Sequence, residues 1–359
     1  MRVLIAAGGT GGHIYPGIAV AKEITRRDPS SLVRFVGTAH GLETRLVPNA
    51  GFELSLIESA GLVNMGLAKR LRGLLILPKS FLAARRLIKA FQPDIVVGAG
   101  GYVSGPVLLM ATLMRVATLV MESNAVPGFT NRRLARFVDA AAVSFAAALP
   151  YFRGKGVLTG NPVRSEFFDI QLRKPDPQRF CLLLFGGSQG ARAINNAMLE
   201  ALAHLDRYRE RMQVMHQTGK LDFEKVRAGY QAAGWKQADV REYIDDMVGA
   251  FAENDLIISR AGATTSFELM AAGKPAVMVP LPGQLEQRRN AEVMQQAGAA
   301  VMIPQDELTG ERLAKEIGSL IENPNEITRM ETAGRKLARR DAAASSVDLM
   351  EGLVQNRLR

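Results

Sequence analysis

Three segments rich in glycine or other small residues could bind phosphate groups through the protein backbone. They are residues 8–13 (Gly-Gly-Thr-Gly-Gly-His), residues 186–190 (Gly-Gly-Ser-Gln-Gly) and residues 259–268, and each follows an apolar run. Glycine lets the backbone turn tightly and approach a phosphate or sugar with no Cβ in the way. A helix that begins there adds unpaired N–H groups and a positive dipole end. We therefore expect a phosphate-bearing ligand, although residues 186–190 alone also fit a tight turn required only by packing.

Two titratable side chains in these segments could take part in the chemistry. His13 stands at the mouth of the helix expected after the first glycine loop, which is where ligands bind in open α/β sheets. A histidine that only caps or packs is the alternative. Glu268 could accept hydrogen bonds from ribose hydroxyls, but the run Thr265-Ser-Phe-Glu268 also fits a capping box, in which the carboxylate bonds the Thr265 backbone N–H. On the sequence, both alternatives remain open for each side chain.

Nicotinamide and metal chemistry are not expected. A dinucleotide-binding loop would need glycine in place of Ile14 and an acid in place of Gly37 or Thr38. The sequence has no Cys/His cluster with metal spacing, and it lacks the Asp-x-Asp motif with which many sugar transferases hold Mg²⁺. With no metal and no cofactor, helix N-termini and a cation such as Arg164 would have to stabilise a departing diphosphate.

The 359-residue chain has a formal net charge of +10 at pH 7, and the excess lies in its first half. Residues 1–163 contain 19 Lys and Arg against 8 Asp and Glu, whereas the remaining residues contain 26 against 27. This asymmetry indicates that the first half meets a polyanion or an anionic surface, unless its basic face is simply solvated. The single cysteine, Cys181, excludes an internal disulfide and fits a reducing compartment.

Residues 67–91 combine the basic and apolar side chains that a helix at a lipid surface requires. They contain seven Lys and Arg, and no acid occurs between Glu58 and Asp94. Leucine, isoleucine and phenylalanine are interleaved, so the segment could sink into an anionic membrane surface. The alternative is that the apolar side chains face the core and the charges are solvated. No nucleic-acid-binding module is recognised, so nucleic acid is not expected as a partner, and no uncharged stretch is long enough to predict a membrane-spanning helix.

Alternating strands and helices must position these segments. Strands are predicted at residues 3–7, 33–36, 95–97, 118–121, 180–185 and 256–258. Helical patterns, such as residues 18–27, lie between them, which predicts parallel sheets covered by helices. The order of strand, glycine loop and helix restarts at the fifth of these strands, with a helix beginning near Ala191. We predict an α/β fold of two doubly wound domains, with the charged, proline-rich residues 173–179 near their boundary and a last helix over roughly residues 338–358.

Several motifs occur in a characteristic order along nearly the whole chain. They are residues 8–21 (GGTGGHIYPGIAVA), 100–106 (GYVSGP preceded by Gly), 160–164 (GNPVR), 186–192 (GGSQGAR), 216–219 (HQTG) and 243–247 (YIDDM). In this order they resemble the MurG-type transferases of glycosyltransferase family 28. These bacterial enzymes add N-acetylglucosamine (GlcNAc) to undecaprenyl-pyrophosphoryl-muramoyl pentapeptide during peptidoglycan synthesis. The first two motifs together are highly specific, whereas a single short glycine loop is not.

The resemblance implies the GT-B fold, in which two Rossmann-like domains face each other across a cleft. Residues 1–163 would bind the lipid-linked acceptor at the membrane, residues 164–341 would bind UDP-GlcNAc, and the helix at 342–359 would pack back on the first domain. The protein would be peripheral, on the cytoplasmic side of the inner membrane. It would transfer GlcNAc to the 4-hydroxyl of the muramoyl sugar of undecaprenyl-pyrophosphoryl-MurNAc-pentapeptide, with inversion, and so convert lipid I to lipid II.

In the first domain the resemblance assigns roles around the donor sugar. Thr10, Gly11 and Gly12 would touch the sugar and the diphosphate. Asn124 would hydrogen-bond the GlcNAc, although the family usually has His-Glu-Gln-Asn where this chain has Met-Glu-Ser-Asn, so a polar contact is lost or replaced. His13 is the candidate general base that activates the acceptor, because a pKa near neutral suits this step. Glu122 or a water molecule are the alternatives.

In the second domain the resemblance places residues on the nucleotide. Arg164 and Ser188 would serve the nucleotide and diphosphate, Ile244 would sit on uracil, and Glu268 would take the ribose. Gln287 is the best match for a sugar-pocket glutamine, in a run that looks shorter than in the family. The residues that would surround the diphosphate are Gly262, Ala263, Thr264, Thr265, Ser266 and Phe267.

Two functions of other kinds remain open on the sequence. A UDP-GlcNAc epimerase of similar fold would need extra acids in the cleft and no lipid-facing segment. A non-catalytic basic protein would bind polyanions in a salt-dependent manner without turning over a sugar donor.

Overall fold

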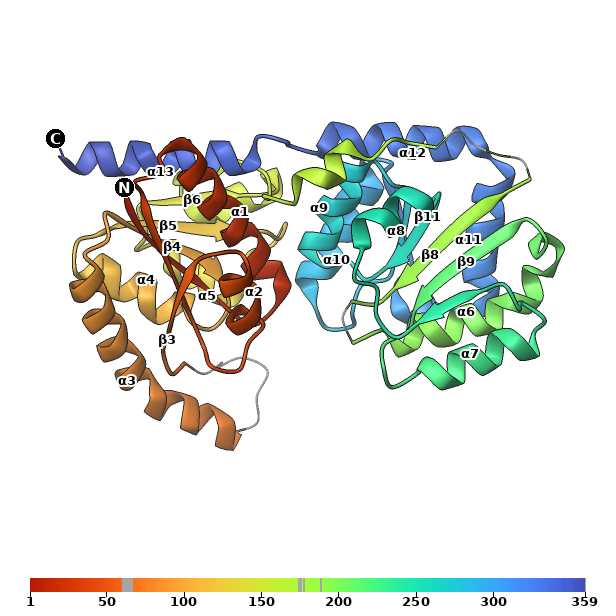
Figure 1. Cartoon of the computed structure of the whole chain (residues 1–359), viewed down its shortest axis with the longest axis horizontal. Helices are drawn as coiled ribbons and strands as arrows, with labels where there is room; N and C mark the ends of the chain where they lie inside the picture. Colours follow the sequence, from red (N-terminus) through yellow and green to blue (C-terminus); the bar gives the residue numbers. More distant parts are fainter. Residues whose placement is uncertain (60–66, 174–175, 177, 188, 359) are drawn as a thin grey trace. The chain divides into compact units, whose positions relative to one another are not determined.

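The computed structural model describes residues 1–59, 67–173, 176, 178–187 and 189–358; for residues 67–76 and 358 it describes the backbone only. The chain divides into two compact units (Figure 1). Unit 1 comprises Met1–Val163 and Arg339–Arg359, and unit 2 comprises Arg164–Ala338. Each unit contains one parallel sheet with helices on both faces, which confirms the predicted α/β fold of two doubly wound domains.

Unit 1 is built on a seven-stranded parallel sheet. Its strands, in sheet order, are β3 (Glu53–Leu56), β2 (Leu32–Gly37), β1 (Arg2–Ala7), β4 (Ile95–Gly100), β5 (Ala117–Glu122), β6 (Ala140–Val143) and β7 (Gly156–Leu158). Its helices are α1 (Gly11–Arg27), α2 (Glu43–Asn49), α3 (Leu67–Phe91), α4 (Ser104–Leu113), α5 (Phe129–Leu134) and α13 (Ala342–Leu358). The central strands β4 and β5 are buried throughout, because helices cover both faces of the sheet. This explains why their sequences are mostly apolar and do not alternate regularly with polar residues.

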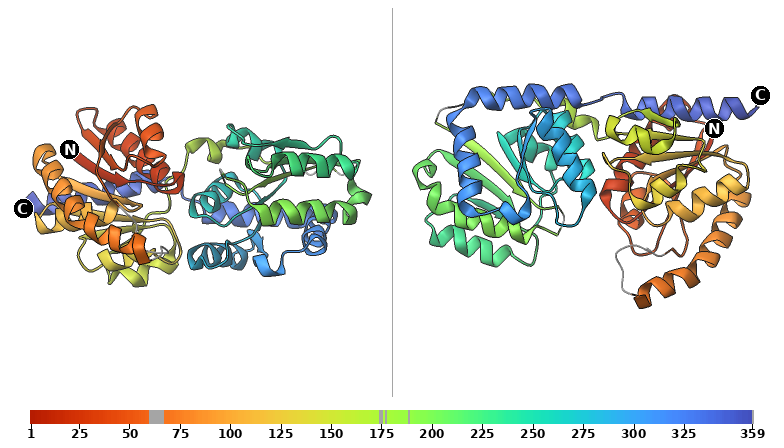
Figure 2. Two further views of the ribbon diagram at one scale, coloured as in Figure 1. Left: turned by 90° about the horizontal axis from the view of Figure 1, so that it is seen from below. Right: turned by 180° about the vertical axis from the view of Figure 1, so that it is seen from behind.

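The last helix of the chain belongs to the core of unit 1. Figures 1 and 2 show α13, coloured blue, beside α1, coloured red, and the two helices pack against each other. Val347 and Met350 are fully buried in the core on this face of the sheet. Arg27 on α1 contacts Asp348 at 2.6 Å and donates to the Ala344 carbonyl at 3.0 Å. The helix begins at Ala342, a few residues after the start near residue 338 that the sequence pattern predicts.

Unit 2 is built on a six-stranded parallel sheet. Its strands, in sheet order, are β10 (Asp239–Arg241), β9 (Met212–Gln217), β8 (Phe180–Phe185), β11 (Leu256–Ser259), β12 (Ala276–Met278) and β13 (Ala300–Met302). Its helices are α6 (Arg192–His204), α7 (Phe223–Ala232), α8 (Met247–Glu253), α9 (Ala263–Ala272), α10 (Leu285–Gln296), α11 (Gly310–Glu322) and α12 (Pro324–Leu337). All six residues of β8 are buried, as expected for the central strand of a parallel sheet.

The strand order of each sheet fixes where a ligand can bind. In an open α/β sheet, ligands bind outside the carboxyl ends of the strands, at the point where the order of connection reverses. In unit 1 this point lies between β1 and β4, and in unit 2 it lies between β8 and β11. The glycine loops after β1 and β8, and the small-residue loop after β11, leave the sheets at these two points.

Candidate functional site

The glycine loop of unit 1 opens directly into a helix. Thr10 is extended (φ −111°, ψ 158°), and α1 begins at Gly11 rather than at the predicted residue 18. Pro16 lies inside the helix, where it cannot donate the helical hydrogen bond to the Gly12 carbonyl. The N–H groups of Gly11 and Gly12 lie in the first turn, where a helix provides no acceptor. They are therefore available to an anion.

His13 lies in the same first turn, and its backbone N–H donates to the Thr10 carbonyl at 3.1 Å. Burial lowers the pKa of the imidazole, and a hydrogen bond with the Ala99 carbonyl acts in the opposite direction. One ring nitrogen of the neutral imidazole donates to that carbonyl, so the other can accept a proton. Gly100, at φ 120°, packs closely on the ring, and a Cβ there would overlap Nδ1 of His13.

Glu122, at the end of β5, organises the loop that carries Asn124. Its side chain is buried, and Oε1 accepts the backbone and side-chain N–H groups of Asn124 at 2.8 and 3.0 Å. Oε2 accepts the Gly128 N–H at 3.1 Å and the Asn131 side chain at 2.8 Å. Burial raises the pKa of Glu122, while these donors oppose that effect. A carboxylate engaged by four donors holds a loop in place, which disfavours Glu122 as the general base.

In unit 2 the loop at residues 186–190 packs backbone to backbone on the turn after β9. Gly190 has φ 74°, and a Cβ there would overlap the Thr218 carbonyl. The Gln217 side chain donates to the Gly187 carbonyl at 2.8 Å and accepts the Ile244 N–H at 3.4 Å. Ile244 as a whole is only 2% exposed, and its N–H is already engaged by Gln217. Ser188 lies outside the described residues.

The loop after β11 ends at a helix N-terminus. Gly262 is extended (φ −64°, ψ 147°) and precedes α9, whose first turn contains Ala263, Thr264 and Thr265. The first helical N–H groups have no acceptor within the helix, and the Ser266 N–H is the one that bonds the Gly262 carbonyl, at 2.9 Å. The buried hydroxyl of Thr264 has no hydrogen-bond partner among the described residues. These groups form a set of donors suited to a diphosphate.

Glu268 pairs with Arg164. Because Gly262 caps α9, Glu268 is in the middle of that helix, and the capping-box alternative is wrong. Its Oε1 lies 3.6 Å from a guanidinium nitrogen of Arg164, which stacks on the Phe167 ring with 4.8 Å between guanidinium carbon and ring centroid. Burial raises the pKa of Glu268 to about 7, and Arg164 opposes this effect. The sequence indicated both residues, but the pairing appears only in the structure.

Gln287, on α10, holds the loop between β12 and α10. Its side-chain oxygen accepts the Leu281 N–H at 3.0 Å. One turn further along, the buried Asn290 donates to the Ala261 carbonyl at 3.2 Å. These bonds connect α10 to the loops after β11 and β12, at the carboxyl ends of the strands. The loop after β11 leads into α9, which contains Glu268.

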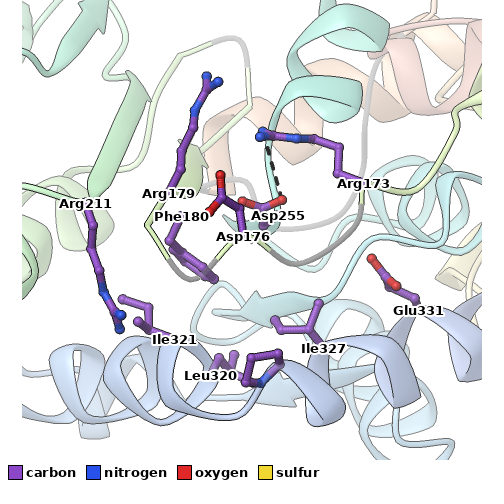
Figure 3. A pocket seen from close by; sticks show the side chains of 11 residues that line it. Arg173, Asp176, Arg179, Phe180, Arg211, Asp255, Leu320, Ile321, Ile327 and Glu331 are labelled. Carbon is purple, nitrogen blue, oxygen red and sulfur yellow. Dashed lines mark ion pairs between the residues drawn. The ribbon is translucent and has the colours of Figure 1, made fainter.

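A cavity in unit 2 lies near the amino ends of the strands, opposite the carboxyl ends where the glycine loops are found (Figure 3). Phe180 begins β8 and Asp255 precedes β11, so their side chains mark the amino ends of these strands. Asp255 pairs with Arg173 at 4.0 Å, and Ile327 of α12 lines the cavity beneath them. None of the predicted site residues lines this cavity. We do not assign the nucleotide to it, because ligands of such sheets bind at the carboxyl ends.

The second half of α3 separates core and solvent faces. Ala84, Ile88 and Phe91 are buried, and Phe81 and Leu87 are half-buried. The exposed side chains in residues 77–91 are Pro78, Lys79, Leu82, Arg85, Arg86, Lys89 and Ala90. In this half of the helix, most large apolar side chains therefore face the core. This agrees with the alternative to membrane binding, in which the apolar residues are packed and the charges are solvated. The side chains of residues 67–76 lie outside the described set.

The part of the chain that the structure describes contains neither a metal-binding cluster nor a membrane-spanning helix. Within it, no three His, Cys, Asp or Glu side chains are grouped closely enough to hold a metal ion. None of the helices described there combines the length and the apolar composition needed to cross a bilayer.

Comparison with known proteins identifies relatives over almost the whole chain. Residues 3–143 match the glycosyltransferase family 28 N-terminal domain, and residues 181–346 match the C-terminal domain of the same family. A protein of Anaeromyxobacter sp. (strain Fw109-5) is 47% identical over 99% of this chain and 94% of its own length. A protein of Citrifermentans bemidjiense is 44% identical over 98% of this chain and 99% of its own. Both are named UDP-N-acetylglucosamine--N-acetylmuramyl-(pentapeptide) pyrophosphoryl-undecaprenol N-acetylglucosamine transferase.

Solved structures agree with this relationship. Acinetobacter baumannii MurG superimposes with a TM-score of 0.80 at 32% identity, covering 98% of this chain and 99% of that chain. A UDP-GlcNAc 2-epimerase from Neisseria meningitidis, solved with bound UDP-GlcNAc, gives a TM-score of 0.72 at 15% identity over 98% of this chain, a likeness that shows the fold alone. The matched family domains, together with relatives more than 40% identical, show that the chain belongs to glycosyltransferase family 28.

Proposed function

We propose that this chain transfers GlcNAc from UDP-GlcNAc to the muramoyl 4-hydroxyl of undecaprenyl-pyrophosphoryl-MurNAc-pentapeptide, converting lipid I to lipid II in peptidoglycan synthesis. The observation that carries the proposal is the 47% identity to a transferase of this name over 99% of the chain. The donor groups at the switch points of both sheets support it, because the reaction must stabilise a departing diphosphate.

Unit 2 takes the donor in this proposal. The first turn of α9 and the Thr264 hydroxyl bind the diphosphate, whose charge they neutralise as UDP leaves. Ionised Glu268 accepts hydrogen bonds from the ribose hydroxyls, and Arg164 keeps this carboxylate oriented. Ser188 contributes to the diphosphate, and Ile244 contacts uracil. Gln287 supports the sugar by holding its loop.

Unit 1 takes the acceptor and supplies the base. The first turn of α1, with Thr10, Gly11 and Gly12, contacts the donor sugar and diphosphate, while Asn124 bonds the GlcNAc. His13 is neutral at pH 7 because burial lowers its pKa. It removes the proton of the 4-hydroxyl as this oxygen attacks the anomeric carbon, and UDP departs in the same step. A single displacement of this kind inverts the anomeric centre.

Transfer of radiolabelled GlcNAc from UDP-GlcNAc to a polyprenyl-linked muramoyl pentapeptide tests the proposal. We expect label in the lipid product and one UDP released for each GlcNAc transferred. Incubation with UDP-GlcNAc alone is the control, because an epimerase would form an epimer or free UDP without an acceptor. Formation of such products without the lipid, and no transfer with it, would refute the transferase assignment in favour of the epimerase.

We also propose that unit 1 attaches peripherally to the cytoplasmic face of the inner membrane through α3. Lys79, Arg85, Arg86 and Lys89 are exposed on α3 together with Leu82, which is 46% exposed. Basic side chains near an anionic surface each contribute about 1 kcal/mol, and Leu82 can enter the acyl boundary. The undescribed side chains of residues 67–76 include three further Lys and Arg.

Flotation with vesicles measures this attachment. We expect binding to vesicles that contain phosphatidylglycerol, weaker binding at high salt, and little binding to pure phosphatidylcholine. Arg85→Glu/Arg86→Glu should reduce binding to the anionic vesicles. The matched control is Lys236→Glu/Lys315→Glu, which makes the same charge change at exposed positions of unit 2. Equal loss in both double variants would show a general charge effect and would contradict the assignment to α3.

A further inference from the structure

We infer that Glu43 is a positioning residue that holds the glycine loop of unit 1 in the conformation needed for sugar transfer. Glu43 is the first residue of α2, and its side chain is 0% exposed. The inference rests on the proposed function, because it assigns Glu43 a part in the same reaction.

The Glu43 carboxylate joins two loops that leave neighbouring strands. Oε2 accepts the Gly9 backbone N–H at 2.9 Å, in the loop after β1. Oε1 accepts the backbone N–H and the hydroxyl of Thr38 at 2.8 and 2.9 Å, in the loop after β2. The Leu42 N–H also bonds the Gly9 carbonyl, at 3.4 Å. Since β1 and β2 are paired in the sheet, one buried side chain connects the loops at their carboxyl ends.

Three glycines leave room for this carboxylate. A Cβ on Gly8 would lie 2.8 Å from Oε1, and a Cβ on Gly37 would lie 2.5 Å from Cγ. A Cβ on Gly41 would overlap the carboxylate itself. The carboxylate is therefore held by the shape of its surroundings as well as by hydrogen bonds, and the glycine loop cannot shift without breaking these contacts.

The bond from Gly9 also fixes the orientation of the peptide group between Gly8 and Gly9. In a trans peptide the N–H and C=O point in opposite directions, so the Gly8 carbonyl points away from Glu43. Gly101 lies on that side, because a Cβ there would overlap the Gly8 oxygen. Gly9 has φ 89°, a conformation that leaves glycine free to adopt other peptide orientations. The flipped peptide is excluded because it would bring the Gly8 oxygen against the carboxylate.

The charge of Glu43 persists although the group is buried. Burial raises the pKa of the carboxyl group, but hydrogen bonds from the N–H groups of Thr38 and Gly9 outweigh this effect and leave the pKa below its usual value. An ionised carboxylate accepts hydrogen bonds at both oxygens. Glu43 therefore acts on the reaction through the loop, whose continuation presents the N–H groups of Gly11 and Gly12 and the His13 side chain.

The test compares Glu43→Gln with the unmodified protein in GlcNAc transfer to the lipid-linked acceptor. Glutamine has the same size, but its amide nitrogen cannot accept, so either Gly9 or Thr38 loses its acceptor. We expect kcat to fall by about tenfold or more, because hydrogen bonds to charged groups are among the stronger ones. The Kd for UDP, measured by calorimetry, should change by less than about twofold, because UDP is assigned to unit 2.

The matched control is Glu53→Gln, which removes an exposed carboxylate from β3 and should leave kcat unchanged. Rates are measured well below the unfolding midpoint of each variant. If Glu43→Gln does not fold, Thr38→Val removes only the hydroxyl donor, and kcat should fall about two- to threefold with UDP affinity retained. Full kcat in the variant tested, or an equal loss of UDP affinity, would overturn the inference. If the unmodified protein transfers no GlcNAc, the proposed function itself fails.

Discussion

Glu268 is expected to lower the stability of the unliganded protein while it strengthens donor binding. Its pKa is raised from the usual 4.5 to about 7 in the folded protein. A change of one pKa unit corresponds to about 1.36 kcal/mol. Above pH 7 the ionised carboxylate therefore lowers the free energy of unfolding by up to about 3 kcal/mol. The folded state binds the proton more tightly than the unfolded chain, and stability from this group therefore falls as pH rises from about 4.5 to about 7.

Glu268→Gln replaces the carboxylate with a neutral group of the same shape. At pH 8, urea unfolding should show a gain of up to about 3 kcal/mol in the free energy of unfolding relative to the unmodified protein. The gain should disappear near pH 4. Glu253→Gln, at an exposed position in unit 2, is the control and should change stability little at either pH.

Donor binding should change in the opposite sense. With a pKa of about 7, about a tenth of Glu268 is ionised at pH 6 and about nine tenths at pH 8, so calorimetry should show UDP-GlcNAc binding about tenfold more tightly at pH 8. Glu268→Gln should bind more weakly at pH 8 and lose this pH dependence. A variant that is less stable at pH 8, or that binds UDP-GlcNAc as the unmodified protein does, would refute the reasoning.

Three further changes test the rest of the site. His13→Ala should lower kcat by about 100-fold or more, the contribution of a general base, with the Kd for UDP-GlcNAc almost unchanged in calorimetry; unchanged turnover would remove His13 from this role. Gly100→Ala should also lower kcat, because its Cβ would displace the His13 ring, whereas Gly154→Ala, at φ 81° with open space around it, should retain transfer activity. Arg164→Ala removes the charge that opposes the raised pKa of Glu268, so the pH midpoint of UDP-GlcNAc binding should move upward; a midpoint that stays in place or falls would contradict the pairing.

Strands were predictable from the sequence because burial on both faces leaves a continuous apolar run. Residues 180–185 form β8 with the predicted bounds, and the strands predicted at residues 3–7 and 118–121 lie within β1 and β5. The start of α1 was missed, because Gly11, Gly12 and Pro16 weaken a helical pattern. Pro16 lies beyond the first turn, inside the helix. The helix predicted over roughly residues 338–358 was too long at its start, since residues 338–341 separate α12 from α13.

Individual site residues were harder to predict than their segments. Thr265-Ser-Phe-Glu268 matched a capping pattern, but Gly262 already caps the helix, so Glu268 was left to pair with Arg164. Glu43 was missed altogether. Its environment depends on Gly8, Gly37 and Gly41 converging on one carboxylate, and no sequence spacing reveals that convergence.

The placement of α13 has a consequence for the order in which the two units can fold. Val347 and Met350 complete one face of the core of unit 1, although all of unit 2 lies between them and the rest of that core along the chain. Unit 2 is one continuous segment, whereas unit 1 is assembled from two segments and lacks part of its hydrophobic interior until α13 docks. Unit 2 can therefore fold without waiting for unit 1, although N-terminal domains usually fold first. A purified fragment that ends at Ala338 should keep unit 2 resistant to proteolysis while unit 1 is cleaved.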